Sequence, residues 1–253
     1  MKRPRPAPLV SGFSLLELIV ALSLTALLML ALVQVVSAGV STTRLQDNQA
    51  ALQDRLRFTA ELLSNTVREA GFTPAPWNTE SALAALGTDT TDGVTAHSDR
   101  LVIQGRSDRN CFESLNPDLD EGGRPRFYIR QTAFDLNGSK YLTRTCRYGP
   151  SPTGLVTQVR RQGLVAGVES FQLLFGEDST LDGEIDRWVR AGQWSSENAV
   201  LGIRVGLLLT GDEGVAARSF GVMNILGQAY HVPADGKLRE TLDIYLALRG
   251  RQR

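Results

Sequence analysis

The stretch from Phe13 to Val36 reads FSLLELIVALSLTALLMLALVQVV, and 19 of its 24 residues are apolar. No charged residue occurs between Leu18 and Thr43. A membrane core of about 30 Å needs roughly 20 apolar residues at the helical rise of about 1.5 Å per residue. A core helix of a water-soluble protein would show a polar stripe along one side, and this stretch has none. The sequence therefore predicts a membrane-spanning helix.

The twelve residues before this stretch are basic, since they carry Lys2, Arg3 and Arg5 and no acidic residue. Positive charge is retained on the cytoplasmic side of a membrane, so the N-terminus is predicted to be cytoplasmic and the main body to be exported. The whole chain has a formal net charge of zero, and without these three charges 24 basic and 27 acidic residues remain. This mildly acidic balance, to which residues 71–125 contribute much, argues against nucleic-acid binding.

Three interpretations of the N-terminus compete. A secretory signal peptide has an apolar region of about 7 to 15 residues, and cleavage after Val36-Ser37-Ala38 would start the mature chain at Gly39. A plain membrane anchor is the second interpretation. The run here is longer than a signal peptide needs and contains an acid, Glu17, near its start. A charge in the hydrocarbon region costs on the order of 2.5 to 3.5 kcal/mol, so Glu17 is expected to have a partner.

The third interpretation rests on a motif. The residues Gly12-Phe13-Ser14-Leu15-Leu16-Glu17, with the apolar run after them, resemble the N-terminus of type IV pilins and pseudopilins. The resemblance implies that a prepilin peptidase cuts between Gly12 and Phe13 and methylates Phe13. It also implies that Glu17 pairs with the N-terminal amine of a neighbouring subunit during assembly. A cationic partner makes a buried carboxylate tolerable, which agrees with this assignment.

The helical pattern continues beyond the membrane segment, and no proline interrupts residues 13–72. We expect one helix that ends near Gly71 as a C-cap, with residues 13–40 as the transmembrane and assembly segment and residues 41–71 as an amphipathic continuation. Phe58 and Leu62 lie off its apolar stripe and either contact other subunits or widen the buried face. The stripe spans about 60° at 100° per residue and comprises Leu45, Leu52, Leu56, Leu63, Val67 and Ala70.

Residues 1–12 are predicted to be a leader. The remainder, residues 72–253, is predicted to be a β-rich globular domain on the periplasmic side. Asn137-Gly138 is a turn signal between two of its strands. The fold class is α+β: a long N-terminal helix packed on an antiparallel sheet, as the pilin resemblance also implies. The expected strands are 101–104, 127–133, 141–146, 155–160, 168–175, 188–190, 201–210 and 242–248.

Further segments are similar, in their order along the chain, to the PilW type of minor pilin. That resemblance implies a subunit of type IV pilus assembly in the priming or tip complex, which supports pilus biogenesis and through it twitching motility, adhesion or DNA uptake. It implies other minor pilins, the major pilin, a tip adhesin, the prepilin peptidase and the inner-membrane assembly platform as partners. A J-type minor pseudopilin of type II secretion is the alternative. The segments are 68–72, 167–169, 174–178, 186–189 and 202–209.

Two further sites follow from the residues. Cys111 and Cys146 are the only cysteines, and both lie in the part predicted to reach an oxidising periplasm, so they are expected to form a disulfide. Closing a loop of about 35 residues stabilises a domain by roughly 3 to 4 kcal/mol in the chain-entropy model.

The segment from residue 178 to 186 has the spacing of a calcium loop. Oxygen-bearing side chains alternate around a glycine, but Val189 stands where a bidentate glutamate is required. An acidic Asp182-Gly183 turn between two strands is the favoured alternative, and calcium is the one cofactor that the sequence suggests. The candidate ligands are Asp178, Thr180, Asp182, Glu184 and Asp186.

No enzyme chemistry is indicated. The sequence has no glycine-rich phosphate loop and no His/Cys metal cluster, and its two histidines, His97 and His231, have no nucleophile signature near them. A membrane-anchored periplasmic binding module or enzyme remains a further alternative, because active sites are assembled in space.

Overall fold

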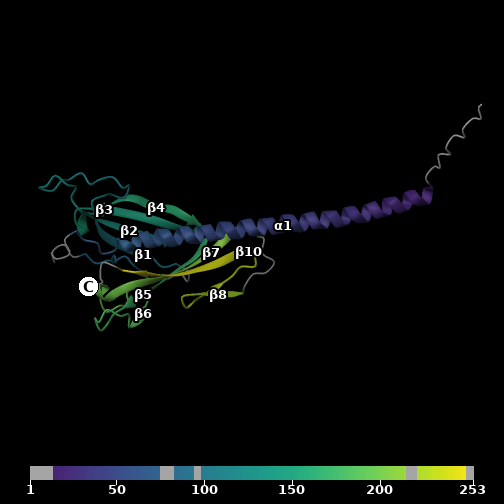
Figure 1. Ribbon diagram of the computed structural model, residues 1–253. Coiled ribbons are helices and arrows are strands. Elements are labelled where there is room, and N and C mark those ends of the chain that lie inside the picture. The colour runs from purple at the N-terminus through teal and green to yellow at the C-terminus, as the bar shows by residue number, and fades with distance from the viewer. Residues whose placement is uncertain (1–13, 75–82, 94–97, 215–220, 249–253) are drawn as a thin grey trace, which may run out of the picture. The chain divides into compact units, whose positions relative to one another are not determined.

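The computed structural model describes residues 14–74, 83–93, 98–214 and 221–248. Contacts divide the chain into two compact units, Met1–Asp47 and Asn48–Arg253. Within the described residues, one long helix, α1 (Leu15–Arg68), precedes ten strands (Figure 1). The strands are β1 (Leu101–Ser107), β2 (Tyr128–Leu136), β3 (Tyr141–Gly149), β4 (Val156–Ala166), β5 (Val168–Glu177), β6 (Arg187–Val189), β7 (Val200–Gly214), β8 (Val222–Ile225), β9 (Gln228–His231) and β10 (Lys237–Ala247).

The strands form two antiparallel four-stranded sheets and a separate hairpin. The first sheet has the order β1-β2-β3-β4, so each strand pairs with the next in the chain, and the second has the order β10-β7-β5-β6. The turn predicted at Asn137-Gly138 connects β2 to β3, where the Asn137 side chain accepts the N–H groups of Ser139 and Tyr141 at 3.0 Å. The predicted α+β fold is confirmed, and all eight expected strands are present.

The sequence missed the hairpin of β8 and β9. Its turn consists of Leu226 and Gly227, both with positive φ, between the paired residues Ile225 and Gln228. Two positive φ values define a type I′ turn, which usually carries Asn-Gly or Asp-Gly. Leucine is disfavoured in this conformation, so the turn gives no ordinary sequence signal.

The C-terminal end of α1 lies against β1. Gly71 has a φ of +69°, the left-handed conformation of a helix C-cap, and its N–H donates to the Gln104 carbonyl at 2.8 Å. Two residues further along β1, the Arg106 N–H donates to the Phe72 carbonyl at 2.8 Å. Between them, a Cβ on Gly105 would lie 2.3 Å from the Glu69 carbonyl oxygen, so this close approach requires glycine.

The predicted apolar stripe of α1 covers the core of the Asn48–Arg253 unit. Leu52, Leu63 and Val67 are at most 1% exposed, and they belong to a cluster that includes residues of both four-stranded sheets. Leu62 packs against the same cluster, which confirms that it widens the buried face. Phe58, by contrast, is 51% exposed. The helix therefore serves as the common cover of the two sheets.

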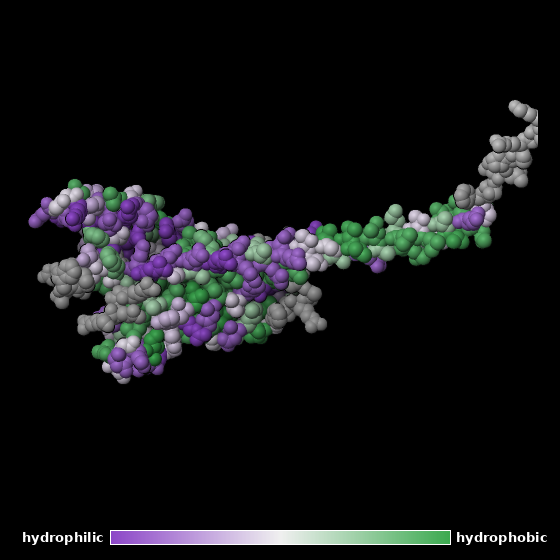
Figure 2. Space-filling model, in the orientation of Figure 1, coloured by the Kyte–Doolittle hydropathy of each residue, from purple (hydrophilic) through white to green (hydrophobic). Residues whose placement is uncertain are grey.

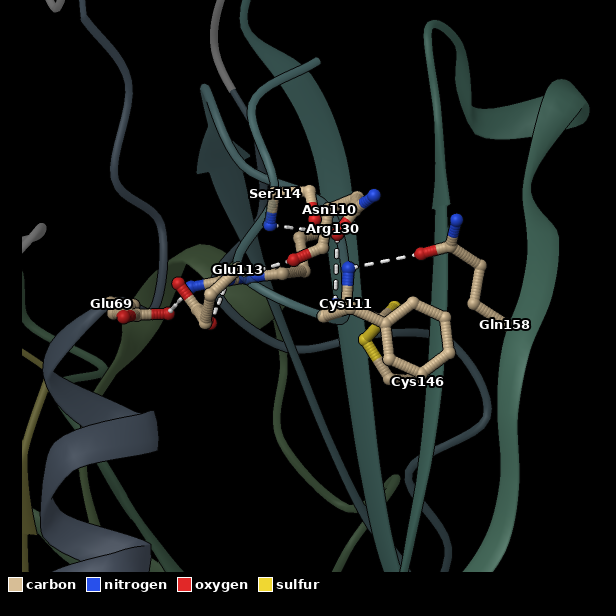
Figure 3. Close-up of a disulfide and its surroundings, with 9 residues drawn as sticks. Glu69, Asn110, Cys111, Glu113, Ser114, Arg130, Cys146 and Gln158 are labelled. Carbon is tan, nitrogen blue, oxygen red and sulfur yellow. Dashed lines mark hydrogen bonds and ion pairs between the residues drawn. A yellow bond between two sulfur atoms is a disulfide. The ribbon is translucent and has the colours of Figure 1, made fainter.

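The disulfide ties the long β1–β2 connection to the first sheet. Cys111 and Cys146 are joined at an S–S distance of 2.07 Å, as the sequence predicts, and the Cys111 N–H donates to the Gln158 side chain of β4 at 3.0 Å (Figure 3). Arg130 of β2 is bound by Glu113 of the same connection at 2.7 Å and by Glu69, just past α1, at 2.6 Å. The contacts of Arg130 thus hold the end of α1, the β1–β2 connection and the first sheet together.

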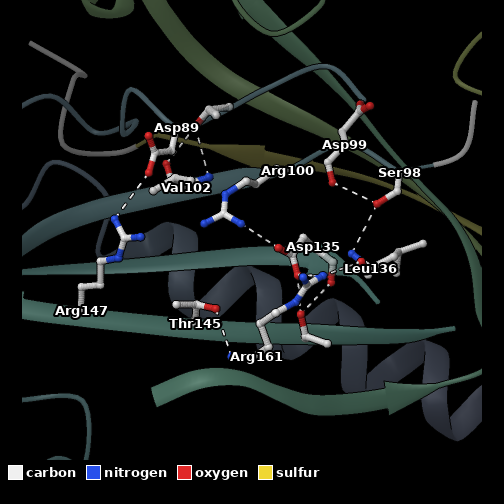
Figure 4. Close-up of polar contacts among 12 residues, drawn as sticks. Asp89, Ser98, Asp99, Arg100, Val102, Asp135, Leu136, Thr145, Arg147 and Arg161 are labelled. Carbon is white, nitrogen blue, oxygen red and sulfur yellow. Dashed lines mark hydrogen bonds and ion pairs between the residues drawn. The ribbon is translucent and has the colours of Figure 1, made fainter. Parts of the chain in front are cut away.

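A buried carboxylate, Asp99, joins the two sheets at the start of β1. It is 2% exposed, and its oxygens accept the N–H groups of Gly93 at 2.9 Å and of Leu173 in β5 at 2.7 Å. Beside it, the Ser98 hydroxyl accepts the Leu136 N–H of β2 at 3.3 Å (Figure 4). Burial raises the pKa of Asp99 to about 6, although these N–H groups and Arg190, 3.9 Å away, oppose the shift.

Removing the disulfide should destabilise the chain. We expect a Cys111→Ser, Cys146→Ser double variant of the full chain in detergent micelles to lose about 3 to 4 kcal/mol of unfolding free energy, because its unfolded state regains the entropy of the open loop. Denaturant titration of the two proteins measures the difference. Reduced wild type should match the variant, and a loss below about 1 kcal/mol would contradict the estimate.

Asp99 should also make stability depend on pH. Because its folded pKa lies above the unfolded value of 3.8, protonation favours folding, and this contribution is lost as pH rises from about 4 through about 6. Relative to Asp99→Asn, the wild type should lose about 2 to 3 kcal/mol between pH 4 and 7. Thermal unfolding of the wild type and of Asp99→Asn between pH 4 and 7 measures this loss of stability. Asp89→Asn, at a carboxylate whose side chain is 52% exposed, is the control and should show a flat difference.

Candidate functional site

The N-terminal part of α1 exposes its apolar side chains. The large apolar residues between Leu15 and Val40 are 48 to 76% exposed, and Figure 2 shows them as a continuous hydrophobic surface. Monomeric soluble proteins rarely expose a contiguous apolar surface of this extent. Within the described residues, α1 is the one helix whose length and composition suffice to cross a membrane. This surface therefore requires lipid or other protein to cover it.

The hydroxyl side chains of this segment donate hydrogen bonds within the helix. The hydroxyls of Ser23 and Thr25 donate to the carbonyls of Val20 and Ala21 at 2.8 and 2.7 Å. Those of Ser37, Ser41, Thr42 and Thr43 likewise donate to carbonyls three or four residues earlier. A hydroxyl bonded in this way can enter an apolar environment without an unsatisfied donor.

The helix begins with a reciprocal pair of hydrogen bonds between Ser14 and Glu17. The Glu17 N–H donates to the Ser14 hydroxyl oxygen at 3.3 Å, and the Ser14 N–H donates to Glu17 Oε2 at 2.9 Å. This is a capping box, which satisfies two N–H groups at the helix start. Ser-x-x-Glu before an apolar run is the signature of this cap, so Glu17 has a role within its own helix besides the external partner expected from the sequence.

Gly12 and Phe13, the residues of the predicted processing site, lie outside the described residues, so cleavage between them stays a prediction. Ser14, the next residue, is the N-cap of α1. Helix α1 therefore begins shortly after the predicted cleavage position. A mature chain that begins at Phe13 would retain the complete capping box.

The candidate calcium loop lies between β5 and β6. Asp178 accepts the N–H groups of Gly183 at 2.8 Å and Asp182 at 3.2 Å, and Asp182 itself accepts the Glu184 N–H at 2.9 Å. Gly183 has a φ of +93°, which permits the turn. Asp178, Thr180 and Asp182 thus come together, whereas the Glu184 carboxylate takes no part in these contacts.

Asp186 closes the same loop. Its Oδ2 accepts the hydroxyl and the N–H of Ser179 at 2.7 Å and the Thr180 N–H at 3.0 Å, and these bonds lower the pKa of Asp186. Among the described residues, no three His, Cys, Asp or Glu side chains are grouped so that they could hold a metal ion. The geometry is that of a turn whose carboxylates bind loop N–H groups, and a metal ion would have to replace some of these bonds.

Two comparisons with known proteins bear on this arrangement. The family model described as type IV pilus-assembly protein W matches residues 126–249, close to half of the chain. The structure is similar to a type IV-like pilin from Thermus thermophilus, with a TM-score of 0.54 and 16% sequence identity over 80% of this chain and 97% of that chain. At this identity the likeness shows the fold alone. No curated protein matches the sequence.

The family and the fold agree with each other and with the exposed helix. The family model is named for type IV pilus assembly, and the similar structure is named a type IV-like pilin. The N-terminal helix is long and apolar enough to anchor such a protein in a membrane. The chain is therefore similar to a pilus-assembly family over residues 126–249 and has the fold of a type IV-like pilin.

Proposed function

We propose that this protein is a PilW-type minor pilin, a non-enzymatic subunit that enters a type IV pilus or its priming complex through the N-terminal part of α1. The observation that carries the proposal is the exposed apolar surface between Leu15 and Val40, with a single carboxylate, Glu17, at its start. Other minor pilins, the major pilin and a tip adhesin are the partners that would cover this surface.

Assembly exchanges lipid contacts of the helix for helix contacts. Packing of apolar side chains drives this exchange, and it does not by itself define a register. Glu17 supplies the register, because docking that leaves its carboxylate unpaired in an apolar environment is penalised. The capping box engages Oε2 of Glu17 with the Ser14 N–H. The second oxygen can then accept the N-terminal amine of a neighbouring subunit, so cap and pairing are compatible.

The basic leader places the N-terminus in the cytoplasm and the globular unit in the periplasm before assembly. There the prepilin peptidase removes residues 1–12 and methylates Phe13, and the inner-membrane assembly platform receives the subunit. The disulfide of Cys111 and Cys146 supports export, because such bonds persist in oxidising compartments. Twitching motility, adhesion or DNA uptake would follow from the pilus rather than from chemistry in this subunit.

A J-type minor pseudopilin of type II secretion would share every feature of α1. The match to a pilus-assembly family over residues 126–249 favours the pilus. A membrane-anchored binding module or enzyme predicts that the unit Asn48–Arg253 acts without the anchor. Deletion of the gene separates the first two, because the pilus hypothesis expects loss of surface pili with normal release of secreted proteins.

The mature N-terminus is the first test. Mass spectrometry of the protein purified from membranes should find a chain that starts at N-methylated Phe13, because the peptidase acts after Gly12. Replacing Gly12 should leave the leader attached and serves as the control. A chain that starts at Gly39 or keeps Met1 would contradict the proposal.

The second test separates the charge of Glu17 from its cap. Glu17→Gln preserves the capping box, since glutamine can serve in it, but removes the charge. We expect at least tenfold fewer surface pili from this variant. Ser14→Ala loses the hydroxyl that accepts the Glu17 N–H, at a cost of about 1 kcal/mol, and should assemble nearly as the wild type does. Glu61→Ala, at an exposed glutamate of the same helix, is the control. Normal pili from Glu17→Gln would contradict the pairing mechanism.

Calcium at the loop of residues 178–186 stays a prediction. The calcium hypothesis expects calorimetric titration of the full chain with CaCl₂ to give a saturable signal that Asp178→Asn abolishes. It also expects EDTA to lower the melting temperature. A flat titration with an unchanged melting temperature would assign the loop to its hydrogen bonds alone.

A further inference from the structure

A cavity of about 150 Å³ lies between the last turns of α1 and the first sheet, within the Asn48–Arg253 unit. The helix contributes Asn65, and β2 and β3 contribute Thr132 and Arg144. The disulfide of Cys111 and Cys146 forms another part of the wall. Residues far apart in the sequence therefore build one polar site, and the disulfide limits how far its wall can move.

Strand alternation explains why this site is polar. Phe134 of β2 and Leu142 of β3 are fully buried and face α1, and Thr132 and Arg144 lie two residues from them on the same faces. Arg144 is the direct cross-strand partner of Phe134. The sheet surface under the helix thus changes from apolar to polar at Arg144, the first cation beyond the core.

The cavity is lined by two acidic residues, Glu69 and Glu113, and two basic residues, Arg130 and Arg144, but the four are not paired evenly. Arg130 is fully engaged, because Glu69 and Glu113 bind its two terminal nitrogens at 2.6 and 2.7 Å (Figure 3). Arg144 is different, since its Nε is buried and has no hydrogen-bond partner among the described residues. Buried polar groups in folded proteins almost always have a partner, so an orphaned guanidinium nitrogen calls for an acceptor that comes from outside the chain.

We propose that this cavity receives a carboxylate side chain of another pilus subunit, which pairs with Arg144. A guanidinium binds a carboxylate with charge-assisted hydrogen bonds, and Thr132 and Asn65 offer further donors. Ligand pockets for larger molecules occupy about 300 to 1,000 Å³, whereas this cavity has the size of one acidic side chain. The assignment of the partner rests on the proposed function.

Phe58 supports a protein partner rather than a free anion. It lies seven residues before Asn65, two helical turns away on the same side of α1, and its ring is 51% exposed. An exposed aromatic ring on the side of α1 that lines the cavity, together with a cation that needs an acceptor, offers the two parts of a protein contact: an apolar anchor and a charged pair. A free carboxylate would use Arg144 and leave Phe58 without a role.

The carboxylate pocket is tested on the ¹⁵N-labelled full chain in detergent micelles. Sodium acetate is titrated against sodium chloride at constant ionic strength, while NMR follows the side-chain Nε–H resonances of arginine. The Arg144 resonance, assigned from Arg144→Lys, should shift and saturate. Arg147, on the same strand with its side chain 38% exposed and 3.5 Å from Asp89, is the control and should not move. An unmoved Arg144 resonance would overturn the pocket.

The subunit source is tested in cells. Arg144→Gln should reduce surface pili at least tenfold, Arg144→Lys should restore part of the loss, and Arg147→Gln should assemble normally. Phe58→Ala should also reduce pili, and because its ring is exposed this variant keeps the fold even if Arg144→Gln does not. Acetate binding with normal pili from Arg144→Gln and Phe58→Ala would overturn the assignment to a subunit.

The same cells distinguish this inference from the proposed function. Loss of pili from Glu17→Gln together with normal pili from Arg144→Gln and Phe58→Ala overturns only the cavity assignment. Normal pili from all three variants overturn the proposed function as well. Loss of pili from all three variants supports both the proposed function and the cavity assignment.

Discussion

The side chains between Leu15 and Val40 expose about half or more of their surface, and nothing in the described chain covers them. Burial of apolar surface is worth about 25 cal/mol per Å², so leaving this segment in water would cost more than the net stability of a typical domain. Its hydroxyls are bonded within the helix, so the segment needs no water. An apolar environment, such as a membrane or a bundle of helices, would cover this segment.

The unit from Asn48 onward has the opposite character, because it buries its own core. In this unit, α1 covers both sheets. Buried charged side chains are bonded to each other instead of to water. Glu169 of β5 and Arg239 of β10, each with a side chain 1% exposed, are joined at 2.6 Å, and Lys140 adds a second cation to Glu169 at 2.7 Å. The Asn48–Arg253 unit therefore needs no partner to complete its core.

The sequence was most informative where a pattern repeats. Helical periodicity located the stripe of α1 and its end at Gly71, and alternation located eight strands, because burial on one face imposes a period. The β8–β9 hairpin was missed since its turn uses leucine at a positive φ. The Arg144 cavity could not be anticipated, because strand register and the position of the helix end decide which cation lacks a partner. The capping box of Ser14 and Glu17 was readable from spacing and was overlooked.

The junction between α1 and β1 decides how the protein carries mechanical load. A pull on the helix reaches the first sheet through the main-chain hydrogen bonds of Gly71 and Phe72 with β1, and β1 passes it to β2 along its whole length. Main-chain hydrogen bonds do not depend on side-chain identity, so surface residues around this junction can be substituted without weakening the link between α1 and β1. Gly105 is the exception, because any side chain there would push the Glu69 carbonyl away and loosen this link between α1 and β1.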